Sequence, residues 1–417
     1  MAADSRGSRL RSDDCLTERL YYTDSYLHEF EARVVAVSGA TVTLDRSAFY
    51  PTSGGQVFDT GWLEANGSVR VRVKDVAEDE QTGDVQHIVE GDAQALSPGS
   101  VVRGTIDAER RLDHMQQHSG QHVLSAAFEK LYGFPTVSFH MGEDSCTIDL
   151  ATDAISTKQL EAAEALANQV IAEDRPVEIR FATANEARSL GVRKIPPAER
   201  QKLRLIEVHD FDLNACGGTH VRSTGQIGCI LLRKTEKVRQ GLRVEFVCGL
   251  RAIRTARRDF ETLTEAASVF STHIWEVPQQ VRKSLDEIKS AQKAQHRLLE
   301  EVAELQAQQM LQSAPERGAH KLVVQFFAER NLGFIKMLAQ KLTKSGTAVA
   351  LLGCGGPQPS LVFAQTAGLA NDMGALMQQT VQQLGTRGGG TRDMAQGGAP
   401  DGASAERALL QAASAIG

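Results

Sequence analysis

The sequence has few aromatic residues and no long apolar segment. Aromatic side chains make up 5% of the 417 positions, and only two residues are tryptophan. No apolar run approaches the roughly 20 residues that a membrane-spanning helix requires. The first residues are polar and charged and lack the apolar stretch of a secretory signal. We therefore expect no membrane partner and no export.

Cysteine is also scarce, and positive charge is not in excess. Six cysteines scattered along 417 residues do not form a disulfide framework, which favours a cytoplasmic protein in a reducing compartment. The formal net charge of -6 argues against a uniformly basic surface that coats nucleic acid, so any RNA contact must use a local patch. The length itself predicts two or three domains.

Two short motifs carry residues that bind metals. The first contains His118 and His122, and the second contains Cys216 and His220. Two imidazoles four residues apart on a helix lie on one face and can reach the same ion. Three histidines and one cysteine form a donor set that zinc accepts in a tetrahedron. The sequence therefore predicts one zinc ion bound by these four side chains.

Each pair alone has a simpler explanation. Histidine pairs on helices are often ordinary surface or core groups, and a single Cys-x-x-x-His is a weaker signal still. The presence of both pairs in one chain, with Gly217 and Gly218 allowing a tight turn beside the cysteine, favours a metal site. The register stays open, because His114 precedes His118 by four residues and forms an alternative pair with it.

These motifs and two neighbouring segments resemble a known family. The chain is similar to the editing domain of alanyl-tRNA synthetases, and most similar to the free-standing alanyl-tRNA editing proteins of the AlaX family, at residues 118–124, 138–142 and 214–221. The related domain of threonyl-tRNA synthetases usually lacks the Gly-Gly-Thr between the second Cys and His. Its presence here favours the alanyl branch.

The resemblance implies a trans-editing hydrolase. An alanine pocket cannot strongly exclude serine, so a second site that hydrolyses the wrong product restores fidelity. The implied substrate is Ser-tRNA(Ala), with Gly-tRNA(Ala) as a second candidate. The bond cut is the ester to the terminal ribose of the acceptor end of tRNA(Ala). The rival hypotheses are a zinc-containing tRNA-binding module without hydrolytic activity and a metal-dependent phosphoesterase.

The resemblance also suggests residues for catalysis and substrate binding. Gln121 stands where the synthetases often have Thr, and it could bind the serine hydroxyl or position water. His140 could act as a base at neutral pH, or it could be an ordinary core histidine. Zinc with four protein ligands has the count of a closed structural site, so its catalytic role stays open. The predicted substrate-binding residues are Gly54, Gly55, Gln56, Gly217, Gly218 and Thr219.

The first half of the chain predicts a small β-domain followed by the zinc domain. Apolar and polar residues alternate between residues 18 and 107, which is typical of half-buried strands. We expect residues 1–107 to form a barrel-like domain, and residues 108–255 to form an α+β editing domain with helices on an antiparallel sheet. The segment 49–56 is either a tight turn or, as the resemblance suggests, a loop that approaches the substrate.

The second half predicts a helical arm and a small α/β domain. Residues 256–314 contain a heptad pattern after Pro278, and either fold back within the chain or form a dimeric coiled coil. Residues 315–417 resemble the C-terminal domain of alanyl-tRNA synthetases and include a glycine-rich loop at 388–398. A homodimer could form through either part. Nothing upstream of the zinc domain is long enough for an aminoacylation domain, so a complete synthetase is not expected.

Basic residues mark two candidate tRNA contacts. One set lies in the zinc domain, and the other flanks the glycine-rich loop, where a phosphate or a 3′ end would fit. An ordinary solvated hairpin and a flexible turn are the respective alternatives. The predicted tRNA-binding residues are Arg233, Lys234, Lys237, Arg239, Arg387 and Arg392. The chain is thus predicted to be an α+β multidomain protein with four parts.

Overall fold

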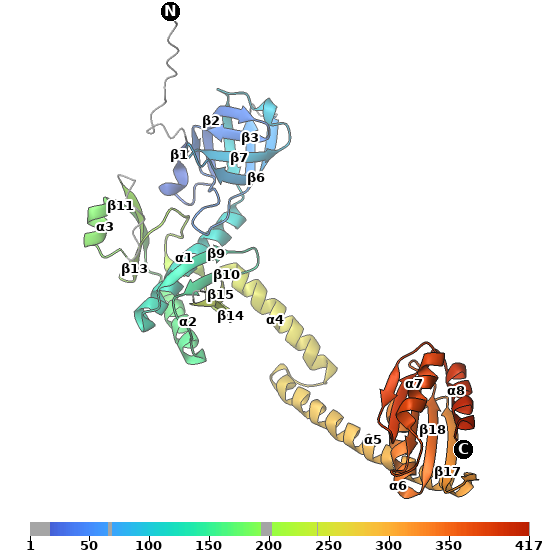
Figure 1. The fold of residues 1–417 in the computed structure, drawn as a ribbon. Helices are drawn as coiled ribbons and strands as arrows, with labels where there is room; N and C mark the ends of the chain where they lie inside the picture. The colour runs from blue at the N-terminus through green and yellow to red at the C-terminus, as the bar shows by residue number, and fades with distance from the viewer. Residues whose placement is uncertain (1–16, 66–68, 193–201, 240, 417) are drawn as a thin grey trace, which may run out of the picture. The chain divides into compact units, whose positions relative to one another are not determined.

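The structure is a computed structural model that describes residues 17–65, 69–192, 202–239 and 241–416. The chain divides into two compact units, Met1–Thr264 and Glu265–Gly417, and each is described by itself (Figure 1). The mixed α/β, multidomain architecture is confirmed. The division into four parts is finer than these two units and stays a prediction.

The first unit begins with a closed antiparallel barrel, which confirms the barrel-like prediction. Its strand order is β2-β3-β7-β6-β5-β8, and β2 pairs with both β3 and β8. Side chains alternate between the interior and the outside, as in β5, where Gly61, Leu63 and Ala65 are buried. The strands are β2 (Glu29–Ser38), β3 (Thr41–Leu44), β5 (Gly61–Ala65), β6 (Val69–Glu78), β7 (Val85–Glu90) and β8 (Val101–Ile106). Two further short strands, β1 (Glu18–Arg19) and β4 (Arg46–Ser47), form a separate parallel pair; β1 precedes the barrel strands in sequence, and β4 stands between β3 and β5.

Helices and two antiparallel sheets complete the first unit. The four-stranded sheet has the order β14-β15-β10-β9, and the three-stranded sheet has the order β11-β12-β13. Helix α1 (Ala108–Tyr132) ends at Gly133, whose φ of 66° is the left-handed conformation that glycine adopts readily. The other elements are α2 (Thr157–Ala172), α3 (Ala184–Ser189), β9 (Thr136–Met141), β10 (Cys146–Leu150), β11 (Val177–Ala182), β12 (Leu203–Val208), β13 (Asp212–Ala215), β14 (Ile230–Val238) and β15 (Gly241–Cys248). Helix α4 (Gly249–Val269) begins in this unit, and its last five residues belong to the second unit.

The second unit is a six-stranded sheet with helices on both faces. Its order is β16-β17-β18-β19-β21-β20. Alternate residues of β18 pack on opposite sides, since Val349 and Leu351 join α7 and α8 in one apolar cluster while Ala350 and Leu352 join α5 (Val277–Ser313) and α6 in another. The elements are β16 (Glu316–Arg317), β17 (His320–Phe327), α6 (Leu332–Ser345), β18 (Ala348–Cys354), β19 (Ser360–Gln365), α7 (Met373–Gln383), β20 (Gly388–Gly390), β21 (Met394–Gly398) and α8 (Gly402–Ser414).

The glycine-rich segment at 388–398 is not the loop that the sequence predicted. It forms the antiparallel pair β20 and β21, at one edge of the sheet. A Cβ atom on Gly390 would lie 2.3 Å from the Met394 carbonyl oxygen, so only a bare backbone fits there.

The heptad pattern lies on α5 (Val277–Ser313), and Pro278 stands in its first turn. Near the helix C-terminus, Leu299 and Val302 pack against a cluster of their own unit. The earlier positions Leu285 and Ile288 are 52% and 53% exposed. The dimeric coiled coil therefore stays a prediction. Among the described helices, none combines the length and apolar character of a membrane span.

Candidate metal centre and adjoining cleft

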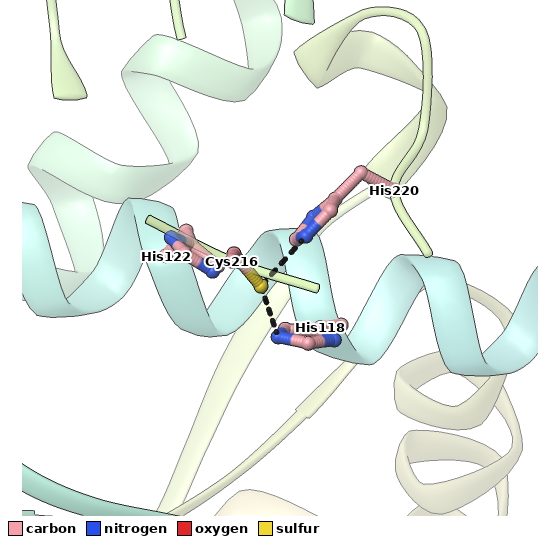
Figure 2. A group of neighbouring side chains, drawn as sticks. All are labelled: His118, His122, Cys216 and His220. Carbon is pink, nitrogen blue, oxygen red and sulfur yellow. Dashed lines mark hydrogen bonds between the residues drawn. The ribbon is translucent and has the colours of Figure 1, made fainter. Parts of the chain in front are cut away.

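The four predicted metal ligands lie together (Figure 2). One ligand atom from each of His118, His122, Cys216 and His220 lies within 4.8 Å of the others. The Sγ of Cys216 is 3.4 Å from Nε2 of His118 and 3.3 Å from Nε2 of His220. His114 is not part of this group, so His118 and His122 are the pair that lies beside Cys216 and His220.

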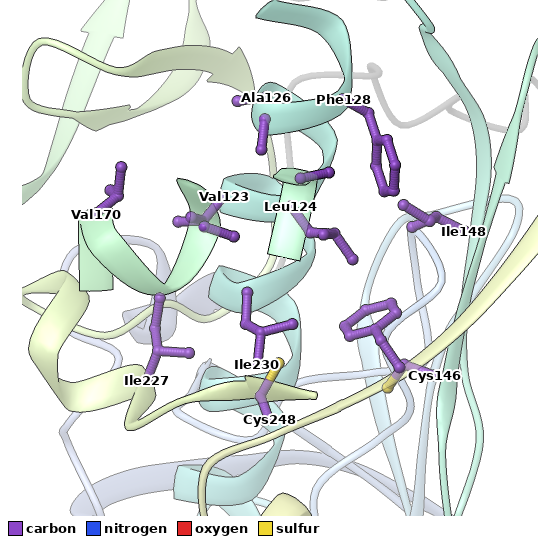
Figure 3. Packing of buried hydrophobic residues seen from close by; sticks show 14 of the residues in the cluster. Val123, Leu124, Ala126, Phe128, Cys146, Ile148, Val170, Ile227, Ile230 and Cys248 are labelled. Atoms are coloured by element: carbon purple, nitrogen blue, oxygen red, sulfur yellow. The ribbon is translucent and has the colours of Figure 1, made fainter. Parts of the chain in front are cut away.

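Helix α1 supplies two of these side chains from one face. His118 and His122 are one turn apart, and their rings stack with centroids 5.3 Å apart. The opposite side of the helix is held by the apolar core of the first unit, in which Val123, Leu124 and Phe128 pack against strand and helix residues such as Ile148 and Val170 (Figure 3). This packing fixes the direction in which the two imidazoles point.

The other two ligands come from the loop after β13. Gly218 in this loop sits directly against the first histidine, since a Cβ atom there would lie 2.1 Å from Cε1 of His118. Arg204 on β12 holds the loop from behind, because its Nη1 donates hydrogen bonds to the carbonyls of Cys216 at 2.8 Å and Gly218 at 2.9 Å. Its Nε donates to the carbonyl of Tyr22 at 2.9 Å.

In each of the three clustered histidines, a polar side chain lies close to Nδ1. Nδ1 of His118 donates to Oε1 of Gln56 at 2.7 Å, and Nδ1 of His220 is 3.2 Å from Oγ of Ser119. Nδ1 of His122 lies 3.5 Å from a carboxylate oxygen of Asp212. Such partners set the tautomer and orient the ring for metal binding.

The electrostatics favour a thiolate at Cys216 and a neutral ring at His220. Burial raises the pKa of the Cys216 thiol, but His118 and His220 outweigh it and hold the pKa well below its usual range. Burial lowers the pKa of His220 to about 3. Burial also acts on His122, yet the Asp212 carboxylate prevails and raises the pKa to about 9, so this ring releases a proton when it binds a metal. A thiolate with three imidazoles fits zinc.

A cleft of about 390 Å³ opens beside the cluster. Its polar wall includes Gln121, whose Nε2 donates to Oγ of Ser125 at 2.8 Å, and Thr136, whose hydroxyl donates to the same oxygen at 2.6 Å. Phe139 forms an apolar wall and stacks on His118 with centroids 5.4 Å apart. Gly54 from the barrel loop also lines the cleft. The arrangement suits a small group with one apolar side and one polar side.

Several predicted site residues have other positions. Gln56 is fully buried, and it donates to Oγ1 of Thr219 while its carbonyl accepts from the Thr219 amide, so both residues support the histidine instead of lining the cleft. His140 is exposed and does not line the cleft, whose wall along β9 runs from Thr136 to Phe139. Gly55 packs against the backbone of Phe139 and serves as a close contact between barrel loop and strand.

The predicted basic residues do not gather at the cluster. Arg233 forms an ion pair with Asp259, and Lys234 lies 3.4 Å from Glu245. Lys237 and Arg239 are exposed at the end of the β14–β15 hairpin. Arg387 and Arg392 belong to the second unit, where both are exposed and Arg392 donates to the carbonyl of Ala370 at 3.2 Å.

Sequence reasoning missed the residues that support the ligands. Arg204, Asp212 and Ser119 carry no motif of their own. The only signal was a charged Arg204 within the otherwise apolar run 203–206, which forms a buried strand. A buried arginine requires hydrogen-bond acceptors, and for Arg204 they include the carbonyls of Cys216 and Gly218 in the loop after β13, which we call the metal loop.

The fold and the site define a class of protein related to aminoacyl-tRNA synthetases. Residues 16–110 match the family described as "tRNA synthetases class II (A)". Residues 203–244 match the "Threonyl and Alanyl tRNA synthetase second additional domain". This second segment contains the Cys216 and His220 loop.

The relatives give the family itself. The chain is 30% identical over 388 residues to "Alanyl-tRNA editing protein AlaX-L" of Pyrococcus horikoshii, which covers 92% of this chain and 94% of that protein. It therefore belongs to the family of AlaX-L alanyl-tRNA editing proteins.

Longer relatives and one solved structure also match. The chain is 34% identical over 398 residues to "Alanine--tRNA ligase" of Archaeoglobus fulgidus, which covers 93% of this chain and 43% of that protein. It thus spans less than half the length of such ligases. The C-Ala domain of Aquifex aeolicus alanyl-tRNA synthetase matches at 20% identity and a TM-score of 0.22, and covers 24% of this chain and 96% of that domain.

Proposed function

We propose that this protein is a zinc-dependent aminoacyl-tRNA deacylase that hydrolyses Ser-tRNA(Ala), with Gly-tRNA(Ala) as a second substrate. The observation that carries the proposal is the His₃Cys cluster at the edge of a small cleft with one polar wall. Membership in the AlaX-L family supports editing as the activity. Removal of the wrong amino acid would protect the fidelity of translation.

His118, His122, Cys216 and His220 would hold the zinc ion. When bound, zinc polarises an ester carbonyl and lowers the pKa of water to about 7. Four protein ligands complete the usual tetrahedron of a structural zinc site. The zinc ion would therefore also have a structural role, in which it holds the walls of the cleft in position. The rest of the chemistry depends on the side chains that position the aminoacyl group.

Gln121 is the proposed specificity residue. Its Nε2 is engaged by Ser125, while its Oε1 has no hydrogen-bond partner within the described part of the chain. This oxygen can accept a hydrogen bond from the hydroxyl of a seryl group. The side chain of an alanyl group has no donor to offer to this oxygen, and a glycyl group has no side chain at all. A site built to bind a hydroxyl discriminates against analogues that lack it, so seryl esters should react fastest.

The tRNA body would contact basic residues away from the cleft. Lys237 and Arg239 have no ion-pair partner among the described residues and extend from the β14–β15 hairpin. Arg387 and Arg392 in the second unit are further candidates. A homodimer through α5 or the second unit would place two such surfaces in one assembly.

The second candidate function is a tRNA-binding module whose zinc is purely structural. The closed set of four ligands favours it. The deacylation assay separates the two functions. Purified protein is incubated with Ser-tRNA(Ala), Gly-tRNA(Ala) and Ala-tRNA(Ala), and the ester remaining is measured with time. The proposal predicts rapid loss of serine, slower loss of glycine and retention of alanine. Binding without loss of any amino acid would leave only the binding module.

Two variants sharpen this assay. Gln121→Leu keeps the size of the side chain and removes the acceptor, so the preference for serine over alanine should fall by about tenfold or more. His140→Ala tests the base that the sequence suggested; its position outside the cleft predicts retained activity. If His140→Ala lost deacylation activity while Gln121→Leu kept the wild-type preference for serine, His140 and not Gln121 would be the residue that acts on the substrate.

A further inference from the structure

One serine of the metal cleft has its hydroxyl hydrogen committed to a residue outside the cleft. Ser138 on β9 lines the cleft, and its hydroxyl donates to Oδ2 of Asp149 on β10 at 2.7 Å. Asp149 lies directly opposite Ser138 in the antiparallel pairing of these strands and does not line the cleft. The hydrogen of this hydroxyl is therefore not offered to a ligand in the cleft.

The Asp149 carboxylate is held from its other side by Arg243 on β15. Its Oδ1 accepts from Nε at 2.7 Å, and its Oδ2 accepts from Nη2 at 2.9 Å, which is the paired geometry of an arginine with a carboxylate. The hydrogen bond from Arg243, with a smaller contribution from Ser138, lowers the pKa of Asp149, so the carboxylate is ionised at neutral pH. An ionised carboxylate can only accept hydrogen bonds. The direction of the bond from Ser138 is thus fixed.

This direction makes the oxygen of Ser138 an acceptor toward the cleft. A hydroxyl has one hydrogen to donate and two lone pairs with which to accept. Oγ of Ser138 accepts no hydrogen bond from the residues that the structure describes, so its lone pairs are available to a ligand. Donation to a charged group polarises the hydroxyl and strengthens its oxygen as an acceptor.

The other two hydroxyls that line the described cleft are bonded to each other. Thr136 donates to Oγ of Ser125 at 2.6 Å, and the same oxygen accepts from Nε2 of Gln121. Because both hydroxyls can donate and accept, the direction of the bond between them can reverse. Only at Ser138 does an ionised partner fix the hydroxyl, among the described residues of this cleft.

Ser138 also lies close to the metal cluster along the chain. It precedes Phe139, whose ring stacks on His118 with centroids 5.4 Å apart. In an aminoacyl ester, one carbon separates the α-amino group from the ester carbonyl, so a carbonyl at the metal cluster keeps the amino group near it. The carboxylate in the cleft wall is further away, because Glu129 follows His122 by seven residues, about 10 Å along α1. An α-amino group donates hydrogen bonds in both of its protonation states, which suits the acceptor at Ser138.

We propose that Ser138 accepts a hydrogen bond from the α-amino group of the bound aminoacyl ester, so that the cleft selects acyl groups that carry an α-amino group over those that lack it. This inference rests on the proposed function for the ester as ligand. Gln121 would bind the side-chain hydroxyl of a seryl group, whereas Ser138 would bind the amino group that seryl and glycyl esters share.

The test uses analogues that the protein cannot deacylate. 3′-Amino-3′-deoxyadenosine with a seryl group in amide linkage is compared with the same compound carrying a 3-hydroxypropanoyl group, which keeps the hydroxyl and lacks the amino group. Dissociation constants are measured by isothermal titration calorimetry on the full chain with zinc added. The wild-type protein should bind the seryl analogue about tenfold more tightly, the gain expected from one hydrogen bond. A glycyl and an acetyl analogue should give the same ratio, because neither has a side-chain hydroxyl.

Substitutions locate that gain. Ser138→Ala removes the acceptor and should weaken only the seryl analogue, so that the two analogues bind about equally. Asp149→Asn should do the same, because its amide can donate to Ser138 and turn the hydroxyl hydrogen toward the cleft. Ser138→Thr keeps the hydroxyl and should keep the preference. Ser145→Ala, in the turn between β9 and β10 and outside the cleft wall, is the matched control.

Several results would overturn the proposal. They are equal binding of the two analogues by the wild type, binding of neither, or a full preference in both Ser138→Ala and Asp149→Asn. An equal loss of both analogues in Ser138→Ala would show a merely structural role. A preference that is lost in Glu129→Gln and kept in Ser138→Ala would assign the amino group to Glu129 instead.

Failure of this proposal and failure of the proposed function give different results. Because the analogues contain an amide, their binding is measured whether or not the protein hydrolyses Ser-tRNA(Ala). A preference that requires Ser138, without deacylation, would refute the deacylase and keep the contact with the amino group. Deacylation without any such preference would refute the contact alone.

Discussion

Gln56 and His118, 62 positions apart in sequence, are joined by a hydrogen bond of 2.7 Å from the imidazole Nδ1 to the amide oxygen. The bond places a group of the barrel loop directly behind a metal ligand of α1. It fixes the imidazole tautomer that presents Nε2 to the cysteine sulfur. The barrel thus contributes directly to the candidate metal centre.

Removal of this support should weaken metal binding without unfolding the protein. Gln56→Leu removes the acceptor for Nδ1, and loss of such a partner typically costs 10- to 100-fold in affinity, so a drop of about that size is expected. Zinc affinity is measured by competition with a chromogenic chelator. Gln94→Leu, at an exposed position, serves as the control. Equal zinc affinities for the wild type and Gln56→Leu would show that the hydrogen bond does not orient the ligand.

The two glycines of the metal loop should respond differently to alanine. In Gly218→Ala the new Cβ would lie 2.1 Å from Cε1 of His118, so the imidazole must move and zinc binding should fall by at least about tenfold. In Gly217→Ala the nearest atom would be the Tyr22 hydroxyl at 3.5 Å, an ordinary contact. Zinc content per protein is measured for both variants. If Gly218→Ala and Gly217→Ala had similar zinc contents, Gly218 would not pack directly against the His118 ring.

Arg204 should slow the dissociation of zinc because it holds the loop that carries Cys216 and His220, and not because it contacts the ion. Arg204→Met keeps much of the side-chain volume but leaves the carbonyls of Cys216 and Gly218 without their donors. We expect zinc to dissociate at least about tenfold faster, because the loop is no longer held in position. Stopped-flow chelation measures this rate. Arg204→Lys, which can satisfy one carbonyl, should give an intermediate rate; a wild-type rate in both variants would contradict the assignment.

Loss of one partner of the buried ion pair between the barrel and α1 should strongly destabilise the fold. Arg111 and Asp59 are both fully buried, and Arg111 also donates to the carbonyls of Ser25 and Ala48. Arg111→Met leaves the carboxylate buried without its partner, which should destabilise the fold by about 3–5 kcal/mol in urea unfolding. Arg103→Met breaks an exposed pair with Glu29 and should change stability little. Similar effects of the two substitutions would show that burial does not matter here.

Stability should fall in mild acid because a histidine is buried in the barrel. His87 is fully buried, its Nδ1 donates to the Val42 carbonyl, and burial lowers its pKa from 6.5 to about 4. The neutral ring is favoured in the fold, so stability is fully present above pH 6.5 and is lost as the pH falls toward 4. The slope is up to about 1.4 kcal/mol per pH unit for one proton.

The measurement is urea unfolding between pH 7 and pH 4.5, with chelator present so that metal release does not contribute. His87→Gln should reduce the slope of unfolding free energy against pH, by up to about 1.4 kcal/mol per pH unit relative to the wild type, which corresponds to one proton. His209→Gln removes an exposed ring as the control. A slope that is the same in all three proteins would exclude His87 as the acid-sensitive group.

Much of the fold followed from periodicity. The alternating segments before residue 107 became barrel strands, and the helical stripe around His118 became α1, because one buried face determines each pattern. The glycine-rich segment was misread as a loop, since glycine has low strand propensity and its pairing depends on close backbone approach to Ala395. Local composition cannot report such a contact.

The cluster of four candidate metal ligands could be predicted, while the residues that support it could not. His118 and His122 share a helix face, so their spacing alone indicates the pair. Gln56 reaches them only because the barrel loop folds against α1, and Arg204 only because β12 runs behind the metal loop. His140 was expected beside the cleft, but the part of β9 that lines the cleft ends at Phe139, and sequence spacing does not show where a strand leaves the wall of a cleft. These relationships depend on tertiary structure, not on spacing.

The central feature of the proposed site is one set of four side chains that would bind a single zinc ion. X-ray absorption at the zinc edge of the purified protein tests it directly. We expect one zinc per chain with one sulfur at about 2.3 Å and three nitrogens at about 2.0–2.1 Å, and loss of the sulfur shell in Cys216→Ser. A shell without sulfur in the wild type, or an unchanged sulfur shell in Cys216→Ser, would contradict the account.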